Sequence, residues 1–464
     1  MSIQNQEIGF DPDALRLKYK AERDKRVRAD GNDQYQEVEG DFAYFVDDPY
    51  IDKTLQRGPV EDQIEVAIIG GGFGGMLAAA RLREAGIDDF RGIEKGGDFG
   101  GTWYWNRYPG ASCDIESYVY FPLLEKTQFA PQQKYTNAAE TLNYCRVIAE
   151  KYDLHANALM QTKVTCTEWD EDSRRWLVKT DRGDAIKARF VVHSNGPLNR
   201  PKLPAISGIT SFKGHTFHTS RWDYGYTGGN SDGGLDKLKN KRVAVIGTGA
   251  TAVQCVPHLG ASAAELYVFQ RTPSSIDLRN NQPTDPDWLA SQKPGWHEAR
   301  RRNFESLMAG VPVKQDLVND GWTEAFRLLF GTVRDKAPSK LRMACWALLA
   351  VGSRDFYRKG AKKYLTEKAM RHMQFDREME LADFRKMESI RARVDRLVDD
   401  SDTAEALKPY YRQFCKRPCF HDEYLQTFNR PNVTLVDTGG RGVDEINTKG
   451  IVLDGKTYEV DCII

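Results

Sequence analysis

Residues 65–76, with the sequence EVAIIGGGFGGM, decide the fold of this 464-residue chain. An apolar run that predicts a buried strand leads into a turn with the spacing G-x-G-x-x-G, formed by Gly70, Gly72 and Gly75, and a helical segment follows. Glycine permits the tight turn, the close approach of a pyrophosphate to the backbone, and close packing of helix on strand. Glu94 ends the next predicted strand, where a carboxylate accepts hydrogen bonds from a ribose diol. The stretch therefore predicts a dinucleotide-binding Rossmann unit, with a chance glycine-rich turn as the alternative.

A second stretch of the same design, RVAVIGTGATA, occupies residues 242–252. Alanine stands at the third glycine position, which still allows close packing. After the next predicted strand the chain carries Arg271 and Thr272, where an NAD-binding unit carries an acid. This pair suits a 2′-phosphate, so we expect NADP here, with a surface arginine after a strand as the alternative. The expected contacts of this turn are Gly247, Thr248, Gly249, Ala250, Thr251 and Ala252.

One unit that ends in an acid and one that ends in an arginine predict FAD first and NADPH second, which is typical of a flavoprotein that accepts hydride. We therefore expect an α/β fold with two Rossmann-like dinucleotide-binding domains and a mostly helical insertion. The expected parts are a charged N-terminal arm packed on the surface (1–62), the first part of the FAD domain (63–200), a linker (201–239), the NADP domain (240–440) with its helical insertion (about 285–410), and the start of a return to the FAD domain (441–464). Because the last segment, 458–464, resembles a buried strand without a cap, we expect the chain to be truncated at its C-terminus.

Composition excludes several classes of function. The chain has 66 Lys plus Arg against 66 Asp plus Glu, so no net charge attracts nucleic acid or an anionic membrane. The longest apolar run, 343–351, falls far short of the ~20 residues that cross a bilayer, and the N-terminus lacks a secretory signal. Eight dispersed cysteines without C-x-x-C spacing, and histidines without ligand spacing, favour a reduced cytoplasmic protein with no metal site.

Two further stretches carry a resemblance to a known family. Residues 212–223, FKGHTFHTSRWD, match the pattern F-x-G-x-x-x-H-x-x-x-W, and residues 100–114, GGTWYWNRYPGASCD, match [AG]-G-x-W-x-x-x-x-[FY]-P-[GM]-x-x-x-D. On these residues the sequence resembles the flavin-dependent Baeyer–Villiger monooxygenases, which convert ketones into esters or lactones. The resemblance runs from about residue 40 to the chain end and is greatest to members that act on large or polycyclic ketones. The chain departs from the family at 194–196, Ser-Asn-Gly, where many members have Ala-Thr-Gly.

The resemblance implies FAD, NADPH, dioxygen and a small-molecule ketone as reaction partners. The reaction also needs a fixed cation to stabilise an oxyanion, and guanidinium suits that task. The resemblance places the catalytic arginine at Arg417, a 2′-phosphate contact at Lys416, and at Asp114 the carboxylate that holds the guanidinium. Without the resemblance, Lys416 and Arg417 are only a basic dipeptide before a proline, and the alternative for Asp114 is a turn cap. We interpret His218 as a hinge that couples NADP binding to domain closure, with direct proton transfer as the alternative. Expected flavin contacts are Thr102, Trp103, Trp105 and Tyr120, and both tryptophans are equally compatible with a plain core role. Tyr104 is a further expected cofactor contact, and Asp114 is expected near the nicotinamide.

Three rival functions share part of this pattern. A related flavin monooxygenase that oxidises nitrogen or sulfur has both glycine-rich turns, but Trp222 and the pattern at 100–114 argue against it. A disulfide reductase of the same architecture is disfavoured because C-x-x-C is absent. A nucleotide-binding regulatory protein or an inactive fragment is the remaining alternative.

Overall fold

The computed structural model describes residues 9–311, 313–331 and 362–464, so the apolar run 343–351 lies outside the described residues. The chain forms two compact units. The helical unit comprises Met1–Val27, Thr272–Asn280 and Glu298–Asn429, and the sheet unit comprises Arg28–Arg271, Asn281–His297 and Arg430–Ile464. None of the helices in the described ranges is both long and apolar enough to span a bilayer.

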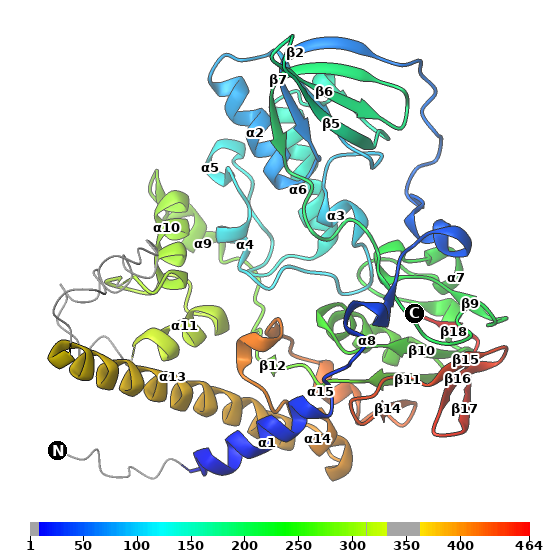
Figure 1. The fold of residues 1–464 in the computed structure, drawn as a ribbon, viewed down its shortest axis with the longest axis vertical. Helices are drawn as coiled ribbons and strands as arrows, with labels where there is room; N and C mark the ends of the chain where they lie inside the picture. Colours follow the sequence, from blue (N-terminus) through cyan, green and yellow to red (C-terminus); the bar gives the residue numbers. More distant parts are fainter. Residues whose placement is uncertain (1–8, 312, 332–361) are drawn as a thin grey trace. The chain divides into compact units, whose positions relative to one another are not determined.

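A six-stranded sheet carries the first glycine-rich turn (Figure 1). Its order is β4-β3-β2-β7-β6-β5, and β4, β3, β2 and β7 run parallel while β7, β6 and β5 form an antiparallel meander. The strands are β2 (Glu61–Ile69), β3 (Phe90–Ile93), β4 (Ala158–Leu159), β5 (Val164–Asp170), β6 (Arg175–Thr180) and β7 (Ala185–His193). The end of β2 is buried residue after residue, as a central parallel strand requires. Helix α2 (Phe73–Glu84) follows the turn and contacts β2, β3, β7 and α6 (Ala138–Lys151).

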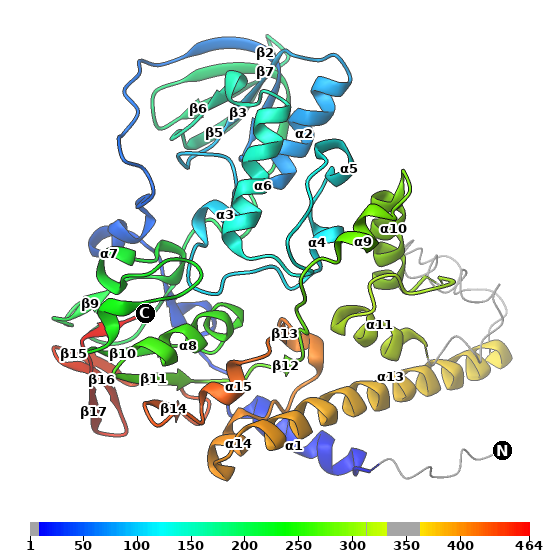
Figure 2. The ribbon, with the colours of Figure 1, turned by 180° about the vertical axis from the view of Figure 1, so that it is seen from behind.

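A five-stranded parallel sheet carries the second glycine-rich turn, in the order β14-β11-β10-β18-β9. Its strands are β9 (His215–Thr216), β10 (Arg242–Ile246), β11 (Glu265–Gln270), β14 (Val433–Asp437) and β18 (Cys462–Ile463). Helix α8 (Ala250–Ser262) follows the turn and lies beside β10 and β11 (Figure 2). The predicted α/β fold with two Rossmann-type units is confirmed.

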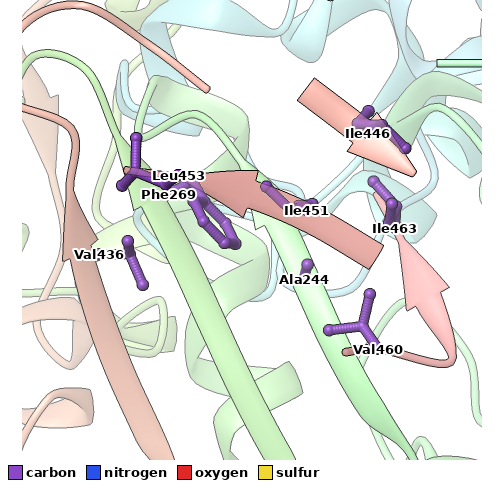
Figure 3. Packing of buried hydrophobic residues seen from close by; sticks show 8 residues of the cluster. All are labelled: Ala244, Phe269, Val436, Ile446, Ile451, Leu453, Val460 and Ile463. Atoms are coloured by element: carbon purple, nitrogen blue, oxygen red, sulfur yellow. The ribbon is translucent and has the colours of Figure 1, made fainter. Parts of the chain in front are cut away.

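A small antiparallel sheet covers the second sheet. It consists of β15 (Glu445–Asn447), β16 (Gly450–Leu453) and β17 (Lys456–Glu459). Figure 3 shows the shared core, in which Ile451 and Leu453 of β16 lie near Ala244 and Phe269 of the parallel strands. The buried members of this cluster are Ala244, Phe269, Val436, Ile446, Ile451, Leu453, Val460 and Ile463.

The end of the chain differs from our prediction. The stretch 458–464 is not one buried strand, because β17 is largely exposed and ends at Glu459. Strand β18 begins at Cys462, which is fully buried and pairs with Val243 of β10. Side chains that are apolar on both faces fit the interior of a parallel sheet, here between β10 and β9. The expected return to the first sheet is therefore wrong for these residues, which belong to the second sheet.

The helical unit contains α1 (Pro12–Asp24), α11 (Gly321–Gly331), α13 (Lys362–Leu397), α14 (Ser401–Leu407) and α15 (Tyr424–Thr427). The N-terminal arm is divided: α1 packs its Tyr19 ring edge-on against Phe384 of α13, whereas Arg28 onwards belongs to the sheet unit. Strand β12 (Ile276–Asp277) pairs with β13 (Cys419–Phe420). The described part of 285–410 also holds α9 (Pro286–Ala290) and α10 (Trp296–Met308).

Short elements complete the two units. They are η1 (Gly31–Gln34), β1 (Tyr35–Gln36), η2 (Gly40–Val46), α3 (Thr102–Trp105), α4 (Ser117–Tyr120), α5 (Leu124–Thr127), η3 (His155–Asn157), β8 (Leu203–Pro204), η4 (Thr219–Arg221), α7 (Tyr224–Thr227), η5 (Asp236–Leu238) and η8 (Gln413–Cys415).

Candidate active site

A cavity of about 930 Å³ opens at the carboxyl ends of β2, β3 and β7 in the sheet unit. Ligands of open α/β sheets bind at this edge, and ligand cavities span roughly 300–1,000 Å³. Seven of the residues expected to contact a cofactor line the cavity: Gly70, Gly72, Glu94, Thr102, Trp103, Trp105 and Tyr120.

The first glycine-rich turn is closely enclosed. Gly70 has φ +106°, and a Cβ there would lie 2.5 Å from the carbonyl oxygen of Ser194. A Cβ on Gly101 would lie 2.6 Å from Cα of Gly72. Gly72 is the N-cap of α2 and has no side chain to satisfy the first N–H groups of the helix. An enclosed backbone cradle with free helical N–H groups fits the pyrophosphate of FAD.

Gly75 serves the packing of α2 on β2. It is buried, does not line the cavity, and would place a Cβ 1.9 Å from the carbonyl oxygen of Gly70. Helix and strand therefore approach each other more closely here than any side chain would permit.

Glu94 is buried and joins the turn to the cavity. One carboxylate oxygen accepts a hydrogen bond from the N–H of Gly71 at 2.5 Å, and the other accepts one from the N–H of Gly96 at 2.7 Å. Burial raises the pKa of this carboxyl group. Glu94 thus fixes the turn while it lines the wall that a ribose would face.

Aromatic side chains from α3 and α4 form another part of the wall. The indole N–H of Trp103 donates a hydrogen bond to the hydroxyl of Tyr120 at 3.1 Å, and Trp105 is 2% exposed. Tyr104 does not line the cavity: its hydroxyl donates to Asp48 at 2.7 Å and accepts from the N–H of Gly97 at 2.9 Å. Tyr104 therefore bonds to the scaffold around the cavity, and its expected contact with a cofactor stays a prediction.

Nothing in the sequence indicates that the N-terminal arm takes part in this cavity. Asp47 and Asp48 line it, together with Val38, Glu39 and Val46. Lys95 was also missed, although it directly follows Glu94. Its ammonium group donates to the backbone and side-chain oxygens of Asn199, at 2.8 and 3.0 Å, and burial lowers its pKa to about 8.

His218 caps η4. Its Nδ1 accepts a hydrogen bond from the N–H of Ser220 at 3.1 Å and lies 2.8 Å from the Ser220 hydroxyl. Burial, followed by the nearby charge of Arg221, lowers the His218 pKa to about 4, so the ring is neutral at neutral pH. Asp114 is buried and lies outside the cavity wall. The hinge role of His218 stays a prediction.

The second glycine-rich turn is open. Gly247 has φ +111°, and a Cβ on Gly247 or Gly249 would meet no described atom within 4 Å. Gly249 is the N-cap of α8 and, like Gly72, offers no side-chain acceptor to the helical N–H groups. Arg271, after β11, donates to the side-chain oxygen of Gln34 at 2.7 Å. The rest of this predicted set starts α8 or borders it: Thr248, Ala250, Thr251 and Ala252.

Lys416 and Arg417 lie in the helical unit, between η8 and β13. The ammonium group of Lys416 donates to the carbonyl oxygens of Thr272 and Pro273, at 3.1 and 3.4 Å, so two residues expected to serve the 2′-phosphate are neighbours. Arg417 is exposed, with its guanidinium carbon 6.0 Å from the centre of the Trp322 ring. Within the described parts of both units, no group of three His, Cys, Asp or Glu side chains is arranged to hold a metal ion.

Comparison with known proteins finds similar sequences and a similar solved structure over almost the whole chain. The pyridine nucleotide-disulphide oxidoreductase family matches residues 67–290. The chain is 54% identical over 455 residues to neopentalenolactone D synthase of Streptomyces avermitilis, covering 98% of this chain and 71% of that protein. It is 49% identical over 461 residues to Baeyer–Villiger monooxygenase ATR8 of Stachybotrys chlorohalonatus, covering 99% and 69%. The solved polycyclic ketone monooxygenase of Thermothelomyces thermophila superposes with a TM-score of 0.83 at 39% identity, covering 97% of this chain and 71% of that one.

Proposed function

The chain belongs to the flavin-dependent Baeyer–Villiger monooxygenases, and from this premise we propose which residues carry its reaction and which ketones it oxidises. The enzymes of this family use NADPH and dioxygen to insert an oxygen atom next to a ketone carbonyl, which gives an ester or a lactone. Bound FAD would supply the redox chemistry that couples oxidation of NADPH to activation of dioxygen, the source of the inserted oxygen atom. The alternative of an oxidase for nitrogen or sulfur is thereby set aside.

We propose that the 930 Å³ cavity holds FAD. The enclosed turn at Gly70 and Gly72 and the uncapped start of α2 would receive the pyrophosphate. Glu94 would face a ribose. The remaining part of FAD would be enclosed by Trp103, Trp105 and the residues around them.

For NADPH we propose the open turn at Gly247 and Gly249. Its uncapped helix start suits a pyrophosphate. We propose Arg271 and Thr272, from their residue types, and Lys416, from the family resemblance, as 2′-phosphate contacts. The hydrogen bond between Lys416 and Thr272 supports the pairing of those two. This division corresponds to an FAD domain at 63–200 and an NADP domain that begins at 240.

Arg417 is our candidate for the catalytic cation. Attack on the ketone carbonyl leaves a negatively charged oxygen, and a guanidinium group that stays charged can donate hydrogen bonds to it. Exposure of Arg417 on a loop leaves this side chain accessible to a ligand. We assign Asp114 to modulation of that charge on the family resemblance, and His218 to the hinge because it lies in the linker between the two glycine-rich units.

We propose a polycyclic ketone as the substrate class. Support comes from the likeness to the solved polycyclic ketone monooxygenase, which extends over 97% of this chain. A cytoplasmic site of action is supported by the described cysteines, none of which is joined in a disulfide. With equal numbers of acidic and basic residues, we expect no nucleic-acid partner.

Product analysis of an arginine pair tests this assignment. Arg417→Ala is compared with Arg412→Ala, which removes an exposed arginine that pairs with Glu380 in the same segment. Both proteins should be purified yellow and bleach with NADPH, because neither substitution touches the proposed FAD wall. Ester from a polycyclic ketone should fall by about 100- to 1,000-fold only in Arg417→Ala. Full ester yield from Arg417→Ala would reject Arg417 as the catalytic cation. Oxidation of a sulfide by the parent protein, without ester formation from a ketone, would reject the proposed reaction.

A further inference from the structure

Arg221 lies inside the F-x-G-x-x-x-H-x-x-x-W stretch but is not one of the four residues that the pattern specifies. Arg221 is the last residue of η4, and it is 6% exposed. In the part of the chain that the structure describes, no carboxylate lies within ion-pairing distance of this guanidinium. Burial accordingly lowers its pKa. A buried arginine without an anionic partner is costly to retain, so its other contacts define its role.

These contacts join three segments that are distant in sequence. Nε donates to the carbonyl oxygen of Asp47 at 2.9 Å, and Nη1 donates to the carbonyl oxygen of Ser220 at 2.8 Å. Nη2 lies 3.4 Å from the carbonyl oxygen of Asn199. Asp47 belongs to the N-terminal arm and Asn199 to the end of the segment before the linker, and both line the large cavity. The guanidinium fork thus fixes the arm and the linker to one point.

The flat face of the same guanidinium stacks on Trp105. Its carbon lies 3.9 Å from the ring centre, within the range of a cation–π interaction. The ammonium group of Lys95 lies 4.9 Å from the same ring and bonds to Asn199. Trp105 lines the cavity whereas Arg221 does not. Two cations therefore hold one wall residue in place, and only one of them reaches the cavity itself.

We propose that Arg221 is a positioning residue for FAD: it acts through Trp105 to shape the cavity wall and ties that wall to the linker and to the arm. The inference rests on the proposed location of FAD in this cavity. Lysine cannot replace the arginine, because a point charge cannot stack flat on the indole and reach two carbonyl oxygens with separate donors. The position thus requires the guanidinium group and not merely its charge.

A double-mutant cycle tests the proposal with FAD affinity as the readout, measured by flavin fluorescence during titration. Arg221→Lys and Trp105→Phe should each weaken FAD binding by about tenfold. Because Arg221 acts through Trp105, the double variant should also be weakened by about tenfold and not by a hundredfold. Arg189→Lys is the matched control: this arginine is exposed on β7 of the same unit and pairs with Glu65, and its replacement should leave affinity within twofold.

Each outcome of the cycle decides one point. If Trp105→Phe binds FAD as the parent protein does, the cavity is not the flavin site, and the proposed function of this wall fails. If Trp105→Phe weakens binding but Arg221→Lys does not, the cavity assignment stands and the role of Arg221 is rejected. A hundredfold loss in the double variant also rejects it, since the two residues would then act independently. If a thermal unfolding experiment shows that Arg221→Lys does not fold, Arg221→Gln takes its place in the cycle.

Discussion

Gly75 is the position at which a single methyl group probes the packing of the first nucleotide turn. A Cβ there would lie 1.9 Å from the carbonyl oxygen of Gly70 and 3.4 Å from Cγ2 of Ile68. A carbon atom and a carbonyl oxygen keep roughly 3.3–3.6 Å apart. To admit the methyl group of Gly75→Ala, α2 must therefore move more than about 1 Å away from β2.

The size of the effect follows from two opposing contributions. Overpacking of a close contact costs about 1–3 kcal/mol, while the higher helix propensity of alanine returns at most about 1 kcal/mol. The contact at Gly70 is with backbone, which has no rotamer to yield, so we expect the upper end of the cost. Gly75→Ala should lower the free energy of unfolding by about 2 kcal/mol. FAD affinity should fall at least about tenfold, because the shift displaces the first N–H groups of α2.

Gly74→Ala is the matched control on the same helix. A Cβ at Gly74 would lie 3.5 Å from the hydroxyl oxygen of Ser194, which is an ordinary contact. We expect this variant to stay within about 1 kcal/mol of the parent protein, on the stabilising side. Urea unfolding followed by far-UV circular dichroism measures stability, and flavin fluorescence measures affinity. Equal unfolding midpoints for the two variants would refute the tight packing inferred at Gly75.

Three further variants test buried charges through urea unfolding. Burial lowers the pKa of His218 from 6.5 to about 4, so the native state holds fewer protons than the unfolded state between these pH values. As pH falls from 6.5 to 4, the free energy of unfolding of the parent protein should therefore fall by up to about 3 kcal/mol relative to that of His218→Gln. Parallel plots of this free energy against pH for the two proteins would contradict the shift. Burial raises the pKa of Asp383 from 3.8 to about 6, so the sign reverses: stability relative to Asp383→Asn should fall as pH rises from 3.8 to 6. Arg57→Met strips the cation from Asp184, whose side chain is fully buried, and should cost about 3–5 kcal/mol at pH 7, whereas Arg81→Met on the exposed pair should cost less than about 1 kcal/mol.

The two nucleotide turns were predictable because their signals are local. An apolar strand, a glycine spacing and a helical segment lie within a dozen residues, and the acid that ends the next strand is fixed by the same geometry. Glu94 accordingly lies at the first turn and holds it. Tyr104 shows the limit of this reasoning, because it sits in α3 between two wall residues yet turns its hydroxyl to Asp48 in the arm.

Features set by distant segments escaped prediction for a physical reason. Cys462 and Ile463 are too few to show a period, so their pairing with β10 depends on contacts 219 residues away in sequence. The arm has a polar composition typical of a surface segment, yet Asp47 offers a backbone carbonyl to Arg221. A backbone carbonyl leaves no mark on the sequence, because every residue carries one. A buried arginine that is held by carbonyl groups therefore has no sequence signature.

The third glycine position differs between the two nucleotide turns, and the packing around it explains the difference. At the first turn, Gly75 is required because α2 lies directly against the backbone of Gly70, the residue that follows β2. At the second turn Ala252 is buried and accommodated, and a Cβ on Gly247 or Gly249 would meet no described atom within 4 Å. Glycine at the first turn and alanine at the second thus record how closely the helix after each turn lies against the backbone that precedes it.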